Sequence, residues 1–300
     1  MHRPRVHHAI AWLLLAASVA AAGELTPVNQ RSYRPYPPVE LTSYIFEAPR
    51  PIRAWTVQID LTSPDIEFAA TCGSDDLEGR LETRCATTQQ FAEDNNVQVA
   101  VNAAPFAPLR DKPGEGMDVV GLGVCNGHMY SEPNDQYGAL VVTRDGRVDI
   151  WAPPYGDRPL DDVEEAVGGF HILVAQGKNV AARAAATTTA KFADVNPRTA
   201  AGLSPDRHTL WLIVVDGRNT ERSEGMTLAE LADFGIFLGC DVLLNLDGGG
   251  SSTLVVEDPA SHEWRVVNQP VGLGPLDTLR QVGNNFGVRI KSELAQESRP

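Results

Sequence analysis

The chain has 300 residues, of which 25 are Lys or Arg and 39 are Asp or Glu, so its formal net charge is −14 at pH 7. This acidity argues against a nucleic-acid partner, because phosphate backbones are bound by clusters of Lys and Arg. It is a weaker argument against a small anionic substrate, because a few local arginines can dominate the field inside a cleft.

Residues 1–22 have the composition of a secretory signal peptide. Arg3 and Arg5 precede an apolar core at residues 9–20, and small residues follow at 20–22. The core is too short to span a bilayer, and no other stretch approaches 18 apolar residues. We therefore expect an exported protein, periplasmic or secreted, without a transmembrane segment. Removing the two arginines would bring its net charge to about −16.

The four cysteines would enter an oxidising compartment if the chain is exported. Cys72 and Cys85 flank a short polar segment, and a disulfide between them would stabilise the fold by about 3 kcal/mol. Cys125 and Cys240 lie in apolar contexts typical of buried thiols. The sequence leaves the pairing open, and the C-x-x-C spacing of a zinc site is absent.

Residues 23–40 are rich in proline and tyrosine, which predicts a linker or an extended lead-in. One domain is expected over residues 41–291, followed by a polar tail at 292–300. Strands are predicted to outnumber helices in its N-terminal half, and a helix is predicted at 87–95. The Ala- and Thr-rich stretch 181–190 fits either a loop or a short helix. Strand patterns lie at 54–61, 97–101, 139–143, 148–151 and 171–175.

A strand–helix–strand pattern dominates the C-terminal half. Residues 210–215 and 241–246 are short apolar runs typical of buried strands. Between them, Thr227 and Glu230 match a capping box, and Gly239 supplies a helix stop. Such a unit places two parallel strands side by side with a right-handed crossover. The predicted fold class is therefore α+β, with a βαβ unit at residues 209–253 that carries the site.

An aspartate follows each of these two strands. Because parallel strands end on the same side of a sheet, Asp216 and Asp247 are expected to face one crevice. After Asp247, the glycines 248–250 allow close approach of backbone N–H groups, and Ser251 and Ser252 add hydroxyl donors. The loop is therefore suited to bind an anion. The alternative is a glycine-rich bulge closed by an Asx-turn at Asp247.

Four segments, in this order, resemble the phosphodiester glycosidase family. They are the PRT run at 197–199, the DGR run at 216–218, the SEGMTL run at 223–228 and the stretch 245–253. The family includes the lysosomal uncovering enzyme, which removes N-acetylglucosamine from its phosphodiester on mannose 6-phosphate. The resemblance is dense over residues 168–288. It implies a hydrolase that cleaves the sugar–phosphate bond of a glycosyl phosphodiester.

The matched segments supply the candidate site residues. Arg198 and Arg218 are expected to hold the phosphate, because guanidinium groups bind phosphate oxygens in pairs. Glycosidic chemistry ordinarily uses one carboxylate at the anomeric centre and another to move the proton. The catalytic candidates are Asp216, Glu224 and Asp247. The further binding candidates are Asn102, Asn245, Gly248, Gly249, Gly250, Ser251 and Ser252.

Simpler interpretations exist for two of these residues, and other functions remain open. Glu224 suits a dipole partner of the following helix, and Asn102 suits a turn cap. Alanines and a proline at 103–105 replace the glycines that the family has after this asparagine. That change favours a carbohydrate-binding envelope protein without turnover. A phosphodiesterase that cleaves the phosphorus–oxygen bond is the other alternative.

No cofactor is expected. The histidines at 128, 171, 208 and 262 show no metal-binding spacing and are interpreted as structural, and the G-x-S-x-G motif of a serine hydrolase is absent. Three acids in one crevice would be able to bind Ca²⁺ or Mg²⁺, which leaves a divalent cation as the alternative. The sequence does not indicate an oligomeric state.

Overall fold

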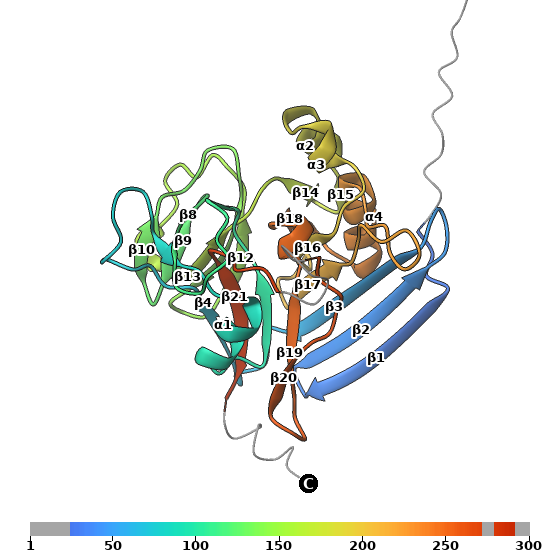
Figure 1. The fold of residues 1–300 in the computed structure, drawn as a ribbon, viewed down its shortest axis with the longest axis horizontal. Coiled ribbons are helices and arrows are strands. Elements are labelled where there is room, and N and C mark those ends of the chain that lie inside the picture. The colour runs from blue at the N-terminus through green and yellow to red at the C-terminus, as the bar shows by residue number, and fades with distance from the viewer. Residues whose placement is uncertain (1–24, 272–278, 292–300) are drawn as a thin grey trace, which may run out of the picture.

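The computed structural model describes residues 25–271 and 279–291 (Figure 1). The predicted signal peptide at 1–22 and the predicted tail at 292–300 lie outside the described residues. The described part is mostly strand with four α-helices, a mixed α and β composition. Within it, none of the helices is long and apolar enough to cross a membrane.

An eight-stranded sheet organises the fold, and each of its strand pairs is antiparallel. In spatial order its strands are β1 (Asn29–Tyr36), β2 (Val39–Phe46), β3 (Ile52–Asp60), β17 (Thr209–Val215), β16 (Arg198–Leu203), β18 (Val242–Asn245), β14 (Ile172–Ala175) and β15 (Lys178–Asn179).

The prediction of a linker at residues 23–40 was wrong, because these residues contribute β1 and the start of β2. β1 pairs with β2 from Asn29 opposite Ile45 to Tyr36 opposite Val39, at one edge of the large sheet. An edge strand tolerates proline, since one side of it makes no ladder hydrogen bonds. Proline content therefore did not distinguish an edge strand from a linker.

The predicted strand–helix–strand unit forms with a different arrangement of neighbours. Helix α4 (Leu228–Leu238) has the predicted capping box of Thr227 and Glu230, and Gly239 ends it in the left-handed conformation. The two flanking strands, β17 and β18, both pair antiparallel with β16, so they run in the same direction but do not touch. The prediction of adjacent parallel strands was wrong, because β16 lies between them.

The two faces of the large sheet contribute to two separate cores. Alternate residues of a strand point to opposite faces, so Leu212 and Val214 belong to one core and Ile213 and Val215 to the other. Helices α2 (Ala181–Thr187) and α4 pack on the second face (Figure 1). The helical alternative for residues 181–190 is thus confirmed, and a short helix α3 (Ala190–Ala193) follows.

Two five-stranded sheets share the first core with the large sheet. One has the order β20 (Glu263–Val266), β19 (Leu254–Asp258), β6 (Val99–Asn102), β21 (Asn285–Ile290) and β4 (Ile66–Ala70). The other has the order β10 (His128–Ser131), β9 (Gly123–Cys125), β13 (Val163–Gly168), β11 (Ala139–Thr143) and β12 (Val148–Trp151).

The remaining elements are short. A three-stranded sheet has the order β5 (Thr83–Arg84), β8 (Gly116–Val119) and β7 (Phe106–Ala107), and a 3₁₀ turn, η1, covers Leu160–Asp162. Helix α1 (Thr88–Asp94) begins after a capping box of Thr87 and Gln90. The predicted helix at 87–95 is therefore confirmed, with its ends as N-cap and C-cap.

The disulfide joins Cys72 to Cys125, with the two Cα atoms 5.0 Å apart. The proposed partner, Cys85, is instead a buried thiol that donates to the carbonyl of Lys112 at 3.1 Å. Cys240 is a buried free thiol, as its apolar context indicated, whereas the same expectation for Cys125 was wrong because Cys125 pairs with Cys72. The pairing depends on the approach of residues 53 positions apart, which local spacing does not reveal.

Candidate active site

A cavity of about 420 Å³ opens at the end of the large sheet where β16 begins and β18 ends. Two kinds of residue line it. The first are charged, polar and glycine residues: Asn196, Arg198, Arg218, Asn245, Asp247, Gly248, Gly249, Gly250 and Arg280. The second are apolar, aromatic and threonine residues: Tyr137, Phe170, His171, Thr187, Thr188, Thr189, Phe192 and Leu228.

Asp247 is the one acidic residue that lines this cavity in the described part of the chain. Its N–H donates to the carbonyl of Ala103 at 2.8 Å, and its own carbonyl accepts from the Asn102 amide at 2.6 Å. Burial raises the pKa of its carboxyl to about 6, while a hydrogen bond from Ser251 and the charge of Arg280 oppose that rise. Such a carboxylate is ionised at neutral pH and can exchange a proton near it.

Arg198 reaches the cavity from the first position of β16. Its side chain is buried, its Nε donates to the carbonyl of Met226 at 2.8 Å, and its Nη2 donates to the carbonyl of Asp194. Burial lowers the pKa of the guanidinium to about 10, which leaves it charged at neutral pH. Because the two carbonyls carry no full charge, the positive charge is held in place without being neutralised.

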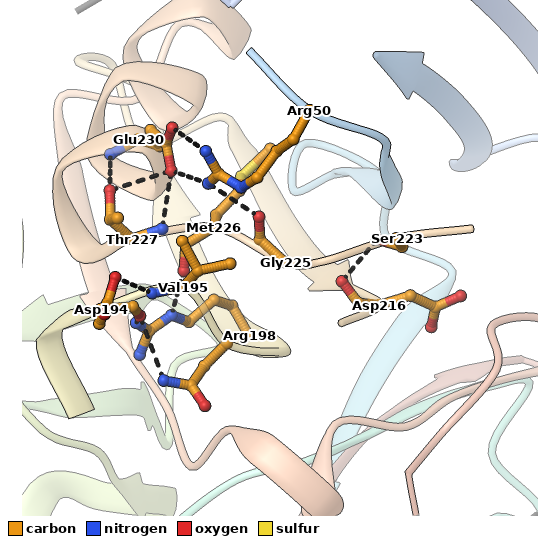
Figure 2. A network of polar contacts seen from close by, with 11 residues as sticks. Arg50, Asp194, Val195, Arg198, Asp216, Ser223, Gly225, Met226, Thr227 and Glu230 are labelled. Carbon is orange, nitrogen blue, oxygen red and sulfur yellow. Dashed lines mark hydrogen bonds and ion pairs between the residues drawn. The ribbon is translucent and has the colours of Figure 1, made fainter. Parts of the chain in front are cut away.

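The segment before α4 positions Arg198 through the Met226 carbonyl (Figure 2). Arg50 forms an ion pair with Glu230 and donates to the carbonyl of Gly225 at 3.0 Å. Glu230 in turn accepts from the backbone N–H of Thr227 at 2.8 Å. These contacts fix the first turn of α4 and therefore the Met226 carbonyl that orients Arg198.

Arg218 approaches from the loop after β17. Its backbone has a φ of 59°, and its Nη2 and Nε donate to Oδ1 of Asn196 at 3.2 and 3.4 Å. The side chain is exposed and reaches the glycine loop, where a Cβ added at Gly249 would lie 2.8 Å from Nη2. Arg198 and Arg218 thus line one cavity, and their role in holding a phosphate stays a prediction.

Arg280 is a third guanidinium group that the sequence analysis missed. Its Nη1 donates to Oγ of Ser251 at 3.4 Å, and its charge acts on the Asp247 carboxyl. Arg280 lies between β19 and β21 outside the four matched segments, and neither a motif nor a periodic pattern marks it. Only the folded chain brings it to the cavity.

The three glycines leave room for these arginines. A side chain at Gly250 would collide with the Arg280 guanidinium and would lie 2.5 Å from the carbonyl of Val271. One at Gly248 would lie 2.8 Å from the carbonyl of Pro197. Gly249 also has a φ of 64°, which side chains rarely tolerate. The loop is therefore bare because guanidinium groups and backbone occupy the space that Cβ atoms would need.

Asp216 does not line the cavity. The prediction that Asp216 and Asp247 face one crevice was therefore wrong. Its buried carboxylate accepts from Asn268 Nδ2 at 3.0 Å and from the N–H of Gln269 at 2.9 Å. In Figure 2 this carboxylate points away from Arg198. Burial raises the pKa of Asp216 to about 6. Asn268 also donates to the carbonyl of Ser252 at 3.0 Å. Asp216 therefore supports, through Asn268, the loop of residues 247–252, which we call the glycine-serine loop, from outside the cavity.

Alternation along the strands explains the difference. Asp216 is an even number of residues from Leu212 and Val214, so it is expected on the same face as these two, which face the core shared with the other sheets. Asp247 is an even number of residues from Leu243, which faces the core beneath α4, and from Asn245, which lines the cavity. Two aspartates at the ends of similarly directed strands therefore face opposite sides of the sheet.

Glu224 and Asn102 also lie outside the cavity lining. Glu224 is placed by its backbone, which donates to the carbonyl of Pro51 at 2.9 Å and accepts from the N–H of Arg218 at 3.0 Å. Asn102 is buried and accepts from Thr199 Oγ1 at 2.8 Å and from the N–H of Thr253 at 3.1 Å. Its amide therefore connects β6, β16 and the loop of Asp247.

The remaining predicted residues divide in the same way. Asn245 lines the cavity, and its buried Oδ1 has no hydrogen-bond partner among the described residues. Ser251 and Ser252 are buried behind the glycines rather than in the lining. The loop thus contributes its glycines to the cavity, and Ser251 acts through Asp247 and Arg280.

Aromatic residues form the part of the cavity that the sequence did not indicate. The ring of Tyr137 packs edge to face against Phe170 and His171, with centroids 5.3 and 5.1 Å apart. His171, interpreted as structural from sequence, lines the cavity, and burial lowers its pKa. Within the described ranges, no group of three His, Cys, Asp or Glu residues is placed to hold a metal ion.

Comparison with known proteins places the chain among related sequences. The family model described as phosphodiester glycosidase matches residues 95–289. The SPbeta prophage-derived uncharacterized protein YomE of Bacillus subtilis strain 168 is 32% identical over 187 residues, which are 58% of this chain and 27% of that protein. The chain thus spans about a quarter of the length of that relative.

Solved structures share the fold at low sequence identity. The zebrafish N-acetylglucosamine-1-phosphodiester alpha-N-acetylglucosaminidase catalytic domain, auto-inhibited by its pro-peptide, matches with a TM-score of 0.64 and 17% identity over 88% of each chain. A hypothetical protein from Synechocystis has a TM-score of 0.64 and 14% identity, covering 88% of this chain and 64% of that one. A putative exported protein from Burkholderia pseudomallei K96243 has a TM-score of 0.52 and 16% identity, covering 83% and 76%. Because the family model matches well over half of its residues, the chain belongs to the phosphodiester glycosidase family.

Proposed function

We propose that this protein is a hydrolase that cleaves the bond between the anomeric carbon and the phosphate oxygen of a glycosyl phosphodiester. The observation that carries the proposal is the convergence of one carboxylate, Asp247, and three guanidinium groups on a single cavity. Arg198, Arg218 and Arg280 give that cavity a local positive charge within a chain of net charge −14. A phosphodiester bound there would be attracted by the arginines although the molecule as a whole is acidic.

The arginines suit the leaving group of this reaction. When the bond breaks, its electron pair goes to the phosphate oxygen, and a phosphomonoester leaves. Guanidinium groups hydrogen-bond to phosphate oxygens and stabilise the charge that develops on them. Because the phosphate leaves readily as an anion, protonation by a general acid contributes little.

Asp247 suits the anomeric centre. As an ionised carboxylate it would stabilise the oxocarbenium-like transition state or take the proton from the attacking water, whose oxygen then forms the new bond to carbon. Its pKa of about 6 suits a base that works near neutral pH. Asp216 and Glu224 are then positioning residues, which act through the glycine-serine loop and the Arg218 backbone.

Export and the substrate class complete the proposal. We infer export from the signal-peptide pattern at residues 1–22, and the disulfide between Cys72 and Cys125 supports it because such bonds persist in oxidising compartments. An exported enzyme of this chemistry would act on an N-acetylhexosamine-type 1-phosphodiester or on an envelope glycan.

Hydrolysis in ¹⁸O-labelled water tests the proposal directly. Purified mature protein is incubated with an N-acetylglucosamine 1-phosphodiester, with and without a chelator. We expect ¹⁸O in the released sugar, unchanged turnover with the chelator, and loss of turnover in Asp247→Asn. Label in the phosphate would instead identify a phosphodiesterase that cleaves the phosphorus–oxygen bond. Binding of the diester without turnover would identify a carbohydrate-binding protein.

A further inference from the structure

A short helical segment between β15 and β16 brings an exposed aromatic ring to the cavity. The segment comprises α2 and α3, and Thr187, Thr188, Thr189 and Phe192 from it line the cavity. The Phe192 side chain is 62% exposed. A single exposed Phe on a surface needs no explanation, but this one lies among other aromatic residues in the lining of a charged cavity.

Direct contacts join this segment to the other aromatic residues. Nε2 of His171 lies 2.9 Å from Oγ1 of Thr187, which connects the end of α2 to the start of β14. His171 and Phe170 both pack against Tyr137 at nearly right angles. One cavity is lined by Tyr137, Phe170, His171, Phe192 and the threonines at 187–189, which we call the aromatic lining.

The residues that follow α3 also hold the arginines. The carbonyl of Asp194 accepts from Arg198, and Oδ1 of Asn196 accepts from Arg218. Asn196 donates in turn to the carbonyl of Lys191 at 2.8 Å, one residue before Phe192. A ligand whose phosphate contacts the arginines therefore has its next group beside the aromatic lining.

We propose that the aromatic lining binds the sugar ring of the substrate and that Phe192 determines the preference for a glycosyl group. This inference rests on the proposed function and deepens it. A pyranose ring has a C–H face that packs on an aromatic ring, and its rim carries hydroxyls that need hydrogen-bond partners. The lining offers both kinds of surface in one place.

The threonines distinguish a sugar from an apolar chain. Thr189 is the N-cap residue of α3, yet its side chain makes no capping hydrogen bond. Its hydroxyl is thus available to a ligand. An acyl chain over these residues would cover hydroxyl groups without replacing their hydrogen bonds to water, which is unfavourable. A ligand with hydroxyls satisfies them.

Two probes with one phosphate each separate sugar recognition from phosphate recognition. N-acetylglucosamine 1-phosphate and inorganic phosphate are measured as inhibitors of the full mature protein and of Phe192→Ala. We expect the variant to bind the sugar phosphate about tenfold more weakly and inorganic phosphate equally well. Phe192→Trp should restore sugar-phosphate binding, and Thr189→Val should weaken it several-fold.

Phe237→Ala is the matched control, because Phe237 is also an exposed phenylalanine, at 54%, but lies on α4 outside the cavity lining. It should leave both inhibition constants unchanged. Equal weakening of both probes in Phe192→Ala, or no change in either, would overturn the inference. So would a dodecyl phosphate that binds more tightly than the sugar phosphate and depends on Phe192. If the wild-type protein hydrolyses no glycosyl phosphodiester, the proposed function itself fails.

Discussion

The loops that follow β17 and β18 begin alike and end differently. The strands run in the same direction, and an aspartate followed by a glycine comes one residue after the end of β17 and two residues after the end of β18. Asp247 shares the cavity lining with three arginines, whereas Asp216 lies outside the lining, accepts from Asn268 and Gln269, and has Arg222 Nε 3.9 Å from its Oδ2. The parity of a residue within its strand decides which side it faces, so a terminal aspartate alone does not identify a catalytic group.

A raised pKa alone does not distinguish the two carboxyls. Burial raises the pKa of both Asp216 and Asp247 to about 6. What differs is their position, since Asp247 lines the cavity together with three arginines, whereas Asp216 lies outside the cavity lining and accepts hydrogen bonds from Asn268 and Gln269. The predictions below test that distinction.

Asp247→Asn should have the largest effect. Loss of the carboxylate at the reacting centre is expected to lower kcat by about 10³-fold, the range typical of a lost acid–base group. Steady-state kinetics on a glycosyl phosphodiester measures it, and circular dichroism checks that the variant is folded. Activity within tenfold of wild type would remove Asp247 from the mechanism.

Arg280→Gln should have the second-largest effect on activity. Removing one of the groups that stabilise charge on the phosphate is expected to lower kcat/KM by about 10²-fold. Arg222→Gln is the matched control, because Nε of Arg222 lies 3.9 Å from Oδ2 of Asp216 instead. Equal losses in the two variants would mean that the two loops do not differ in function.

The pH dependence of activity should report Asp247. Because its carboxyl must be ionised to act as a base, kcat/KM is expected to rise about fivefold from pH 5 to pH 6, the pKa being about 6, and to level off above pH 7 at about tenfold its value at pH 5. The Asp216→Asn variant should keep the same midpoint. A midpoint that moves in that variant would link Asp216 to the chemistry.

Asp216→Asn should have the smallest effect on activity, less than about fivefold, and a measurable effect on stability. Burial makes ionisation of Asp216 less favourable in the folded state than in the unfolded state, so the free energy of unfolding of the wild type falls as the pH rises from about 4 to about 6. The variant should show a shallower fall in chemical denaturation. An unchanged slope would contradict the raised pKa.

Local patterns predicted the parts of this molecule that depend on local interactions. The capping box of Thr227 and Glu230 and the stop at Gly239 were confirmed because caps involve residues within a few positions of each other. The ordered motifs indicated the family, which the family model confirms. The predicted roles of Arg198, Arg218 and Asp247 stay predictions, although the fold brings all three to one cavity.

What the sequence could not reveal depends on distant pairing. β16 separates β17 from β18 because it pairs with both, and a βαβ pattern does not show an inserted strand. Arg280 and the partner of Cys72 come from unmarked segments. The side of the sheet that Asp216 faces follows from its even spacing from Leu212, but only once the two faces of the sheet have been assigned.

Asn102 has a consequence for how heat would inactivate the protein. This buried amide ends the middle strand of a five-stranded sheet and hydrogen-bonds to Thr199, Thr253 and Asp247. Displacing the glycine-serine loop would therefore break hydrogen bonds that tie it to two sheets at once. Catalytic decay on warming should coincide with global melting rather than precede it through local fraying.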